Sequence, residues 1–283
     1  MAGFPVSIRD FGLMGDPTGL VQRGQIILDD DMADGPQGWR QLTTQNLREQ
    51  GTVSYIHYRG KPCVIARTPN IAGAAAMAIG REVTVIPDAR YLVEMLVSLH
   101  DNDTADPLPT PNPSWVEFAL DSAKFNAGGT RRYFSLKHDI AGLLTGTPQS
   151  FAITLSDGLG GATYYTLPFP PGDAVFAWPN NENKHLPTYV AFVVNAFSGK
   201  YEGVQIGSGT RYRWGVLSNK TDITLSDQGT AFGQDLPRFG GGFNPLISLS
   251  NRPSGSLNGS GTMSLFRNRV TALNQGNRPF SEY

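Results

Sequence analysis

Cysteine is almost absent from this chain of 283 residues, because Cys63 is the only one. A disulfide within the chain is therefore impossible, and the hydrophobic core has to stabilise the fold. Cys63 is followed by Val64 and Ile65, and this apolar setting predicts a buried rather than a reactive thiol.

Charge and long apolar runs are also scarce. Charged residues make up 17% of the chain and the formal net charge is −1, so no overall positive field attracts nucleic acid or an anionic membrane. No run reaches the roughly 18 apolar residues of a membrane-spanning helix, and the first residues lack the pattern of a signal peptide. We expect no nucleic-acid partner, no membrane insertion and synthesis in the cytoplasm without a signal peptide. The expected place of action is a virion, or the extracellular space after lysis.

Glycine and proline are abundant, with 33 and 20 residues scattered through the chain without a fixed period. The lack of a period excludes collagen, and the composition is typical of an all-β protein with many turns. Alternating apolar residues then predict the individual strands. They lie at 25–29, 53–58, 61–66, 90–99, 115–120, 131–138, 188–195, 201–206, 210–217 and 262–270.

Two regions interrupt this pattern. Residues 1–24 hold many glycines and prolines and predict an irregular N-terminal arm, and residues 227–261 predict a long irregular loop before the last strand. The expected organisation is one sandwich domain over 25–273, which includes that loop, followed by a tail at 274–283. Residues 70–79 are small and apolar, and the sequence leaves a short helix and a buried pair of strands equally open.

Three stretches carry a resemblance to a known family. Residues 189–206 form a long apolar segment, an Asn-Ala-Phe-Ser-Gly-Lys turn and a returning segment, residues 34–39 read Asp-Gly-Pro-Gln-Gly-Trp, and residues 263–270 close the pattern. In this order they resemble concanavalin A-like and laminin G-like domains, which implies an antiparallel jelly-roll β-sandwich. They are also similar, more loosely, to sandwich domains encoded in phage tail-gene regions.

That resemblance raises the question of catalysis, because some jelly rolls are polysaccharide lyases. Such lyases place a histidine after a Gln-Ile pair, whereas here Gln205-Ile206 is followed by Gly207, and their arginine-rich motif is absent. A glycosidase needs two facing carboxylates, and Glu94 and Glu117 sit on separate predicted strands, where a solvated position is expected. We therefore expect a protein without enzymatic activity.

Two acid-rich loops are candidate calcium sites, since calcium binds six to eight oxygen ligands. The first holds Asp29, Asp31 and Asp34, and the second holds Asp101, Asp103 and Asp106. Jelly rolls often carry a structural calcium near the first strand, which the resemblance implies here as well. An ordinary aspartate-rich turn is the alternative interpretation.

Exposed aromatic rings are the usual means by which a sandwich binds sugars. The candidate glycan-binding residues are Trp178, Tyr164, Tyr165 and Tyr58, whereas Trp39 and Trp115 are expected to anchor the core. The expected function is a non-enzymatic structural or attachment protein of a virion, such as a phage tail or decoration component, with a glycan-binding surface. It would form oligomers or contact other virion subunits through 1–24 and 227–261, and would bind a cell-surface glycan. The alternatives are a stand-alone carbohydrate-binding module and a divergent polysaccharide-active enzyme.

Overall fold

The computed structural model describes most of the β-structure of the chain. It covers residues 24–36, 38–42, 52–58, 61–68, 76–81, 90–101, 113–123, 131–140, 142, 145–147, 150–156, 162–167, 188–195, 200–208, 211–215, 243–251 and 261–273. Every regular element in these ranges is a strand, and every pairing between them is antiparallel. Over the same residues, no helix is long and apolar enough to cross a membrane.

The first sheet, sheet A, has eight strands. Seven follow the order β13-β12-β11-β6-β15-β4-β3, and the eighth, β1, pairs with 268–273 of β15, whereas β4 pairs with 262–265 of β15. Its strands are β1 (Gly24–Asp30), β3 (Thr52–Tyr58), β4 (Lys61–Arg67), β6 (Arg90–Asp101), β11 (Thr188–Asn195), β12 (Lys200–Ser208), β13 (Arg211–Gly215) and β15 (Gly261–Leu273). The hairpins β3–β4 and β12–β13 are those that the turn residues predict.

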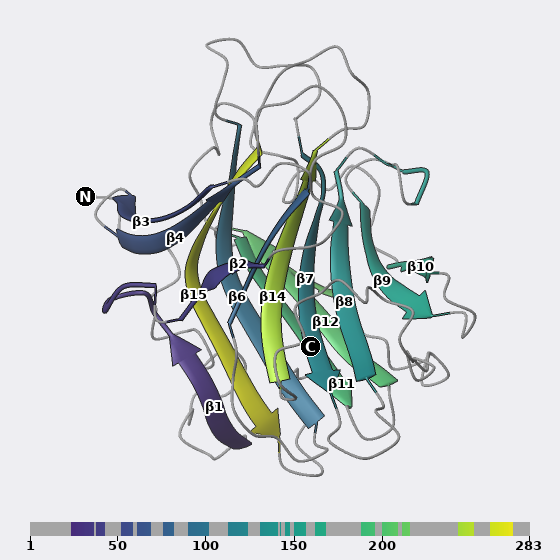
Figure 1. Ribbon diagram of the computed structural model, residues 1–283. Helices are drawn as coiled ribbons and strands as arrows, with labels where there is room; N and C mark the ends of the chain where they lie inside the picture. The colour runs from purple at the N-terminus through teal and green to yellow at the C-terminus, as the bar shows by residue number, and fades with distance from the viewer. Residues whose placement is uncertain are drawn as a thin grey trace.

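The second sheet, sheet B, has seven strands in the order β10-β9-β8-β7-β14-β5-β2. They are β2 (Arg40–Leu42), β5 (Ala76–Gly80), β7 (Pro113–Ala123), β8 (Arg131–Asp139), β9 (Ser150–Ser156), β10 (Ala162–Thr166) and β14 (Phe243–Asn251). In Figure 1, β14, β7 and β8 pass in front of β6, β11 and β12 of sheet A, so the two sheets form stacked layers.

The main core lies between the layers and follows the alternation of the sequence. One face of each strand contributes apolar side chains to a single buried cluster, for example Val93 and Met95 from β6, and Val116 and Phe118 from β7. The predicted all-β antiparallel sandwich is therefore confirmed. Cys63 is fully buried, as expected, and lies outside this core in a second cluster with Leu96 and Phe266.

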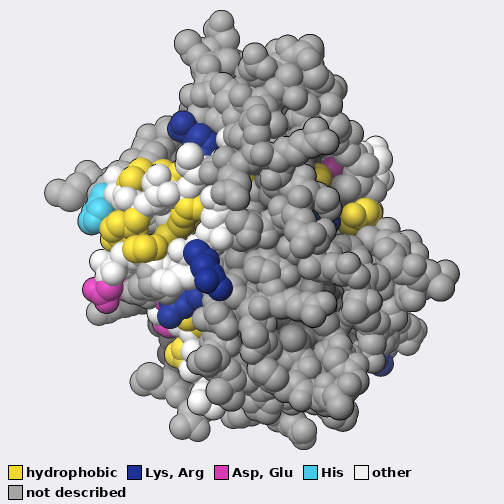
Figure 2. Space-filling view, viewed as in Figure 1, with side chains coloured by type: hydrophobic (Ala, Val, Ile, Leu, Met, Phe, Trp, Pro, Cys, Tyr) yellow, Lys and Arg dark blue, Asp and Glu magenta, His cyan; other side chains and the backbone are white. Residues whose placement is uncertain are grey.

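Strands β6 and β11 are buried on both faces. Leu92 and Leu96 belong to the second cluster, whereas Val93 and Met95 belong to the main core. By contrast, β3 at the sheet edge is more open, since Ile56 is 37% exposed. Figure 2 shows hydrophobic side chains at the surface on the side where β3 and β4 lie.

Three expectations need correction. Residues 227–261 were expected to be irregular throughout, but 243–251 form β14, which pairs with β7 and β5 in the interior of sheet B. The helical alternative for 70–79 is wrong for 76–79, which belong to β5. The irregular arm predicted at 1–24 extends one residue too far, because Gly24 begins β1; residues 1–23 and the predicted tail 274–283 lie outside the described part of the chain.

The register of β12 with β13 bears on which positions of β13 lie beside the core residues of β12. Alternation favours Tyr212 and Trp214 on the core side, but the register pairs Trp214 with Gln205 and Arg213 with Ile206. Directly paired residues share a face of the sheet, and Ile206 lies in the core. Position 213, rather than position 214, is therefore in register with a core residue of β12.

Candidate functional site

The outer face of sheet B carries a group of polar and aromatic side chains on β7 and β8. Because Val116 and Phe118 point into the core, Trp115 and Glu117 lie on the opposite face of β7. The register pairs Glu117 with Lys137 and Trp115 with Asp139, so these residues of β8 share that outer face.

Lys137 is the centre of this group. Its Nζ lies 3.5 Å from Oε1 of Glu117, and both side chains are almost completely buried. The same Nζ lies 4.5 Å from the ring centroid of Trp115 and 5.0 Å from that of Tyr164, which comes from β10. The ammonium group is therefore held by one carboxylate and by the electron-rich faces of two rings.

The pKa of Lys137 reflects these contacts. Burial alone would lower it, but the Glu117 carboxylate and the Tyr164 hydroxyl outweigh burial and hold the pKa above its ordinary value of 10.5. Lys137 is thus a permanent cation at neutral pH.

Small side chains surround this cluster and leave room for it. Lys137 pairs with Ala152 on β9, and Ala119 pairs with Ser135, and both alanines are fully buried. The hydroxyls of Ser135 and Thr154 lie 2.5 Å apart in a hydrogen bond between β8 and β9. Bulky rings on β7 and β10 therefore flank a row of small residues on the strands between them.

Of the predicted glycan-binding residues, the structure places one in this cluster and one on the opposite face of the sheet. Tyr164 is part of the Lys137 cluster, whereas Tyr165 points to the other face and packs against the core. The side chain of Tyr58 and the whole of Trp178 lie outside the described residues.

Of the two tryptophans expected in the core, only one lies there. Trp39 is a core residue, with 4% of its surface exposed. Trp115 was expected there too, but it lies on the outer face of sheet B and is only partly buried. The signal that could have found it is the alternation of β7, where Val116, Phe118 and Leu120 already occupy the core face.

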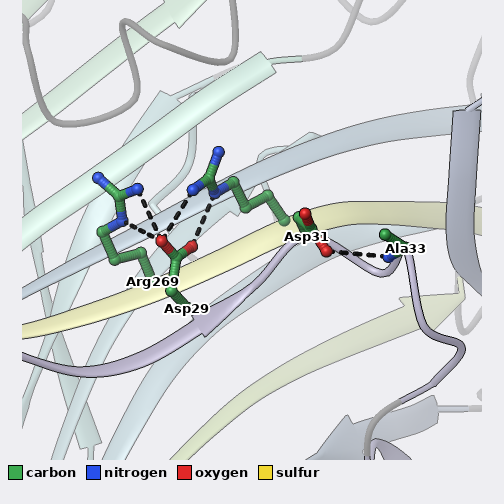
Figure 3. Close-up of polar contacts among 5 residues, drawn as sticks. Asp29, Asp31, Ala33 and Arg269 are labelled. Atoms are coloured by element: carbon green, nitrogen blue, oxygen red, sulfur yellow. Dashed lines mark hydrogen bonds and ion pairs between the residues drawn. The ribbon is translucent and has the colours of Figure 1, made fainter.

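The first predicted calcium loop is built around arginines. Asp29 accepts hydrogen bonds from Arg267 (Nε, 2.8 Å) and Arg269 (terminal nitrogen, 2.7 Å), both on β15 (Figure 3). Asp31 accepts a 2.9 Å bond from the Ala33 amide, as in an aspartate-capped turn, and Asp34 is exposed. Within the described residues, no three acidic, histidine or cysteine side chains are grouped to hold a metal ion.

The second predicted calcium loop stays a prediction. The side chain of Asp101 and the whole of Asp103 and Asp106 lie outside the described residues.

The arginines change the chemistry of Asp29. Burial alone would raise its pKa, but the hydrogen bonds from Arg267 and Arg269 outweigh burial and bring the pKa below the ordinary 3.8. The carboxylate is therefore charged at neutral pH and neutralised by guanidinium groups.

Asp30, the next residue, has a structural role that the sequence did not indicate. Its carboxylate accepts a 2.8 Å bond from the Trp39 indole and pairs with Arg81, and its side chain is buried. Burial raises the pKa of Asp30 more than these donors lower it. The contacts connect the end of β1 to Trp39, just before β2, and to Arg81, just after β5.

The two strand glutamates were expected to be solvated, and this is wrong for both. Glu94 is 2% exposed and accepts a 2.8 Å bond from the Tyr189 hydroxyl, and Glu117 is 6% exposed. Glu94 points away from the core on sheet A, and Glu117 points away from it on sheet B. Because the sandwich separates them, they cannot face one glycosidic bond.

No family model and no curated protein matches the chain. Solved structures with a similar course of the chain include the lumenal domain of VIP36 with Ca²⁺ and Man2 bound, at 10% identity, 91% coverage of each chain and a TM-score of 0.47. Another is the CBM2 module of the evolved Dit of Lactobacillus casei BL23 phage J-1, at 10% identity, with 91% of this chain and 99% of that chain covered and a TM-score of 0.43. A third is a Bacillus licheniformis β-glucanase, at 11% identity, with 88% and 99% covered and a TM-score of 0.46. At such identities the similarity concerns the path of the chain and not its function.

Proposed function

We propose that the protein binds a glycan through the outer face of sheet B, without chemical turnover, as an attachment or structural component of a virus particle. The observation that carries the binding proposal is the cluster in which Lys137 lies between Trp115 and Tyr164. Trp115 and Tyr164 are both only partly buried, so part of each residue is exposed.

The chemistry of this cluster suits a sugar. A sugar ring presents C–H groups that pack on an aromatic face, and hydroxyls that bond to charged or polar side chains. Here two rings supply the apolar contact, while Glu117 and Lys137 supply an acceptor and a donor between them. Their mutual ion pair holds both side chains in place before a ligand arrives, which lowers the entropy cost of binding.

A catalytic role is the competing candidate, because two carboxylates share this face. Glu117 and Asp139 are diagonal neighbours across β7 and β8, a position that puts their α-carbons about 7–8 Å apart. Asp139, however, is fully buried and accepts bonds from the Thr145 amide (2.7 Å) and hydroxyl (2.9 Å). A carboxylate committed to a turn in this way is poorly placed to act on a bound sugar, which supports the non-enzymatic proposal.

Binding and turnover can be tested on the same protein. We expect a glycan array to identify a ligand, and Trp115→Ala and Tyr164→Ala each to weaken it by about tenfold, or about 1.4 kcal/mol. His57→Ala is the matched control, because His57 is an exposed ring on β3 of the other sheet. Thermal unfolding of each variant separates a lost contact from a lost fold.

Two results would contradict the proposal. One is the absence of any glycan whose binding depends on Trp115 or Tyr164. The other is release of reducing ends or unsaturated products that stops in Glu117→Gln. The second result would favour the divergent polysaccharide-active enzyme.

The virion setting rests on the sequence alone, through the resemblance to phage tail-region sandwiches. Neighbouring capsid or tail genes, and detection of the protein in purified particles by mass spectrometry, are the expected findings. Sugar-catabolism genes beside it, with no protein in particles, would favour a stand-alone carbohydrate-binding module. Subunit contacts through 1–24 and 227–261, and a structural calcium, belong to the same proposal and are tested by assembly state and by calcium titration.

A further inference from the structure

The described charges around Lys137 on the outer face of sheet B are few, and the carboxylates outnumber the ammonium group. Glu117 lies opposite Lys137, and Asp139 lies two positions further along the same strand, opposite Trp115. One ammonium group and two carboxylates give this cluster a formal charge of 1 − 2 = −1.

A further cation on this face stands too far away to alter that balance. Arg40 on β2 pairs with Gly80, whose other partner Leu246 pairs with Ala119, so the register puts Arg40 on the outer face. It is four strands from β8, or about 19 Å at the usual strand spacing. That exceeds the screening length of about 8–10 Å at physiological salt.

We propose that Glu117 determines specificity at this site by neutralising Lys137, so that the site takes neutral glycans and rejects uronate-containing ones. This inference rests on the proposed function, because it concerns the ligand of the same site. A uronate carboxylate near Lys137 would have to displace Glu117 from a buried ion pair, and it would also meet the charge of Asp139. A neutral sugar needs neither change, because its hydroxyls can share the existing donors and acceptors.

The site also lacks the arrangement that would favour an acidic sugar. A carboxylate is best bound by an arginine in a two-bond contact or by an ammonium group with no other anion. Lys137 is the one described cation beside the two rings, and its Nζ is already shared between Glu117 and those rings.

The test compares each glycan with a partner that differs only in charge. The neutral probes are soluble β-glucan, mannan and galactan oligosaccharides, and each is compared with its C6-oxidised form. Any further glycan that the array retains is added, and an acidic one is compared with its carboxyl-reduced form. Isothermal titration should show the neutral member binding about tenfold or more tightly, as expected for repulsion in a poorly solvated site. Binding of the neutral member should change by less than about twofold between about 0.05 and 0.5 M salt.

Two variants with the same change in net charge sharpen the test. Glu117→Gln brings the formal charge of the cluster from −1 to 0, so the preference for the neutral member should fall by about tenfold. Glu202→Gln removes the same charge from β12 on sheet A, where Glu202 pairs with Arg90, and should leave the preference unchanged. The comparison of neutral and acidic members uses the wild-type protein, so equal or tighter binding of the acidic member still overturns the inference if Glu117→Gln does not fold.

The possible results separate this inference from the proposed function. Equal or tighter binding of the acidic member, strong salt dependence, or an unchanged preference in a folded Glu117→Gln protein would overturn the inference while leaving glycan binding intact. The absence of Trp115-dependent binding to any probe would overturn the proposed function and this inference with it.

Discussion

Tyr201 links the two sheets through the core, and removing its hydroxyl should be costly. It lies on β12 of sheet A, and its hydroxyl accepts a 2.8 Å bond from the Ser135 amide on β8 of sheet B. The hydroxyl also donates a 3.0 Å bond to the Thr154 carbonyl on β9. Its ring packs edge-on against Phe134, with the ring centroids 5.4 Å apart.

The size of the effect follows from burial. Tyr201 is 1% exposed, and burial raises the pKa of its hydroxyl, which therefore stays neutral and able to donate. Tyr201→Phe keeps the ring and its packing but removes a partner from a buried amide and a buried carbonyl. Water cannot easily replace it, because Ser135 and Thr154 are fully buried. Leaving such groups unsatisfied costs about 1–3 kcal/mol, so we expect the free energy of unfolding to fall by that amount.

Urea denaturation followed by tryptophan fluorescence measures this loss as a shift in the midpoint at constant slope. Tyr55→Phe is the matched control, because its hydroxyl donates a 2.9 Å bond to the Met32 carbonyl at a part-buried position. Water can take over that bond, so its loss should cost less than about 1 kcal/mol. A Tyr201→Phe loss below about 0.5 kcal/mol, or one no larger than that of Tyr55→Phe, would refute the view that this hydroxyl joins the sheets.

Two further predictions concern acid and thiol chemistry. Because the folded state lowers the pKa of Asp29, its pairing with Arg267 and Arg269 stabilises the protein above about pH 4 and is lost as the pH falls through the folded pKa. An aspartate is ionised at pH 6 to 7, so the wild type should melt at a higher temperature than Asp29→Asn there. The two melting temperatures should converge in acid. A difference that stays constant with pH would contradict this prediction. Cys63 is fully buried, so a thiol reagent should label it only as fast as the protein opens, and rapid native labelling would show that β4 is more exposed than described.

Sequence patterns predict some residues of the candidate site and miss others. Alternation predicts that Tyr164 and Tyr165 lie on opposite faces of a strand, and Tyr164 belongs to the cluster. The sequence interpretation places Trp115 in the core, whereas it lies on the outer face of sheet B. Its partner Lys137 lies 22 positions further along the chain, and only the register of β7 with β8 brings the two together.

The acid-rich loop after β1 shows how a local sequence pattern can suggest a site while missing the residues that actually contact it. Asp29, Asp31 and Asp34 form a local pattern that is compatible with a calcium loop. Arg267 and Arg269 are 238 and 240 positions away from Asp29, and no local pattern reports them. The antiparallel pairing of β1 with β15 places them beside its carboxylate.

The amino-acid pattern is sufficient to predict an antiparallel β-sandwich, because side chains alternate across a strand and the apolar ones must share a core. It also determined the hairpins and the buried thiol. The pairing of distant strands is needed to establish that 76–80 and 243–251 are strands, since both gain their hydrogen bonds from partners distant in sequence. It likewise decided which outward-facing residues meet around Lys137, because strand order and register are set by how the whole sheet pairs and not by any segment of it.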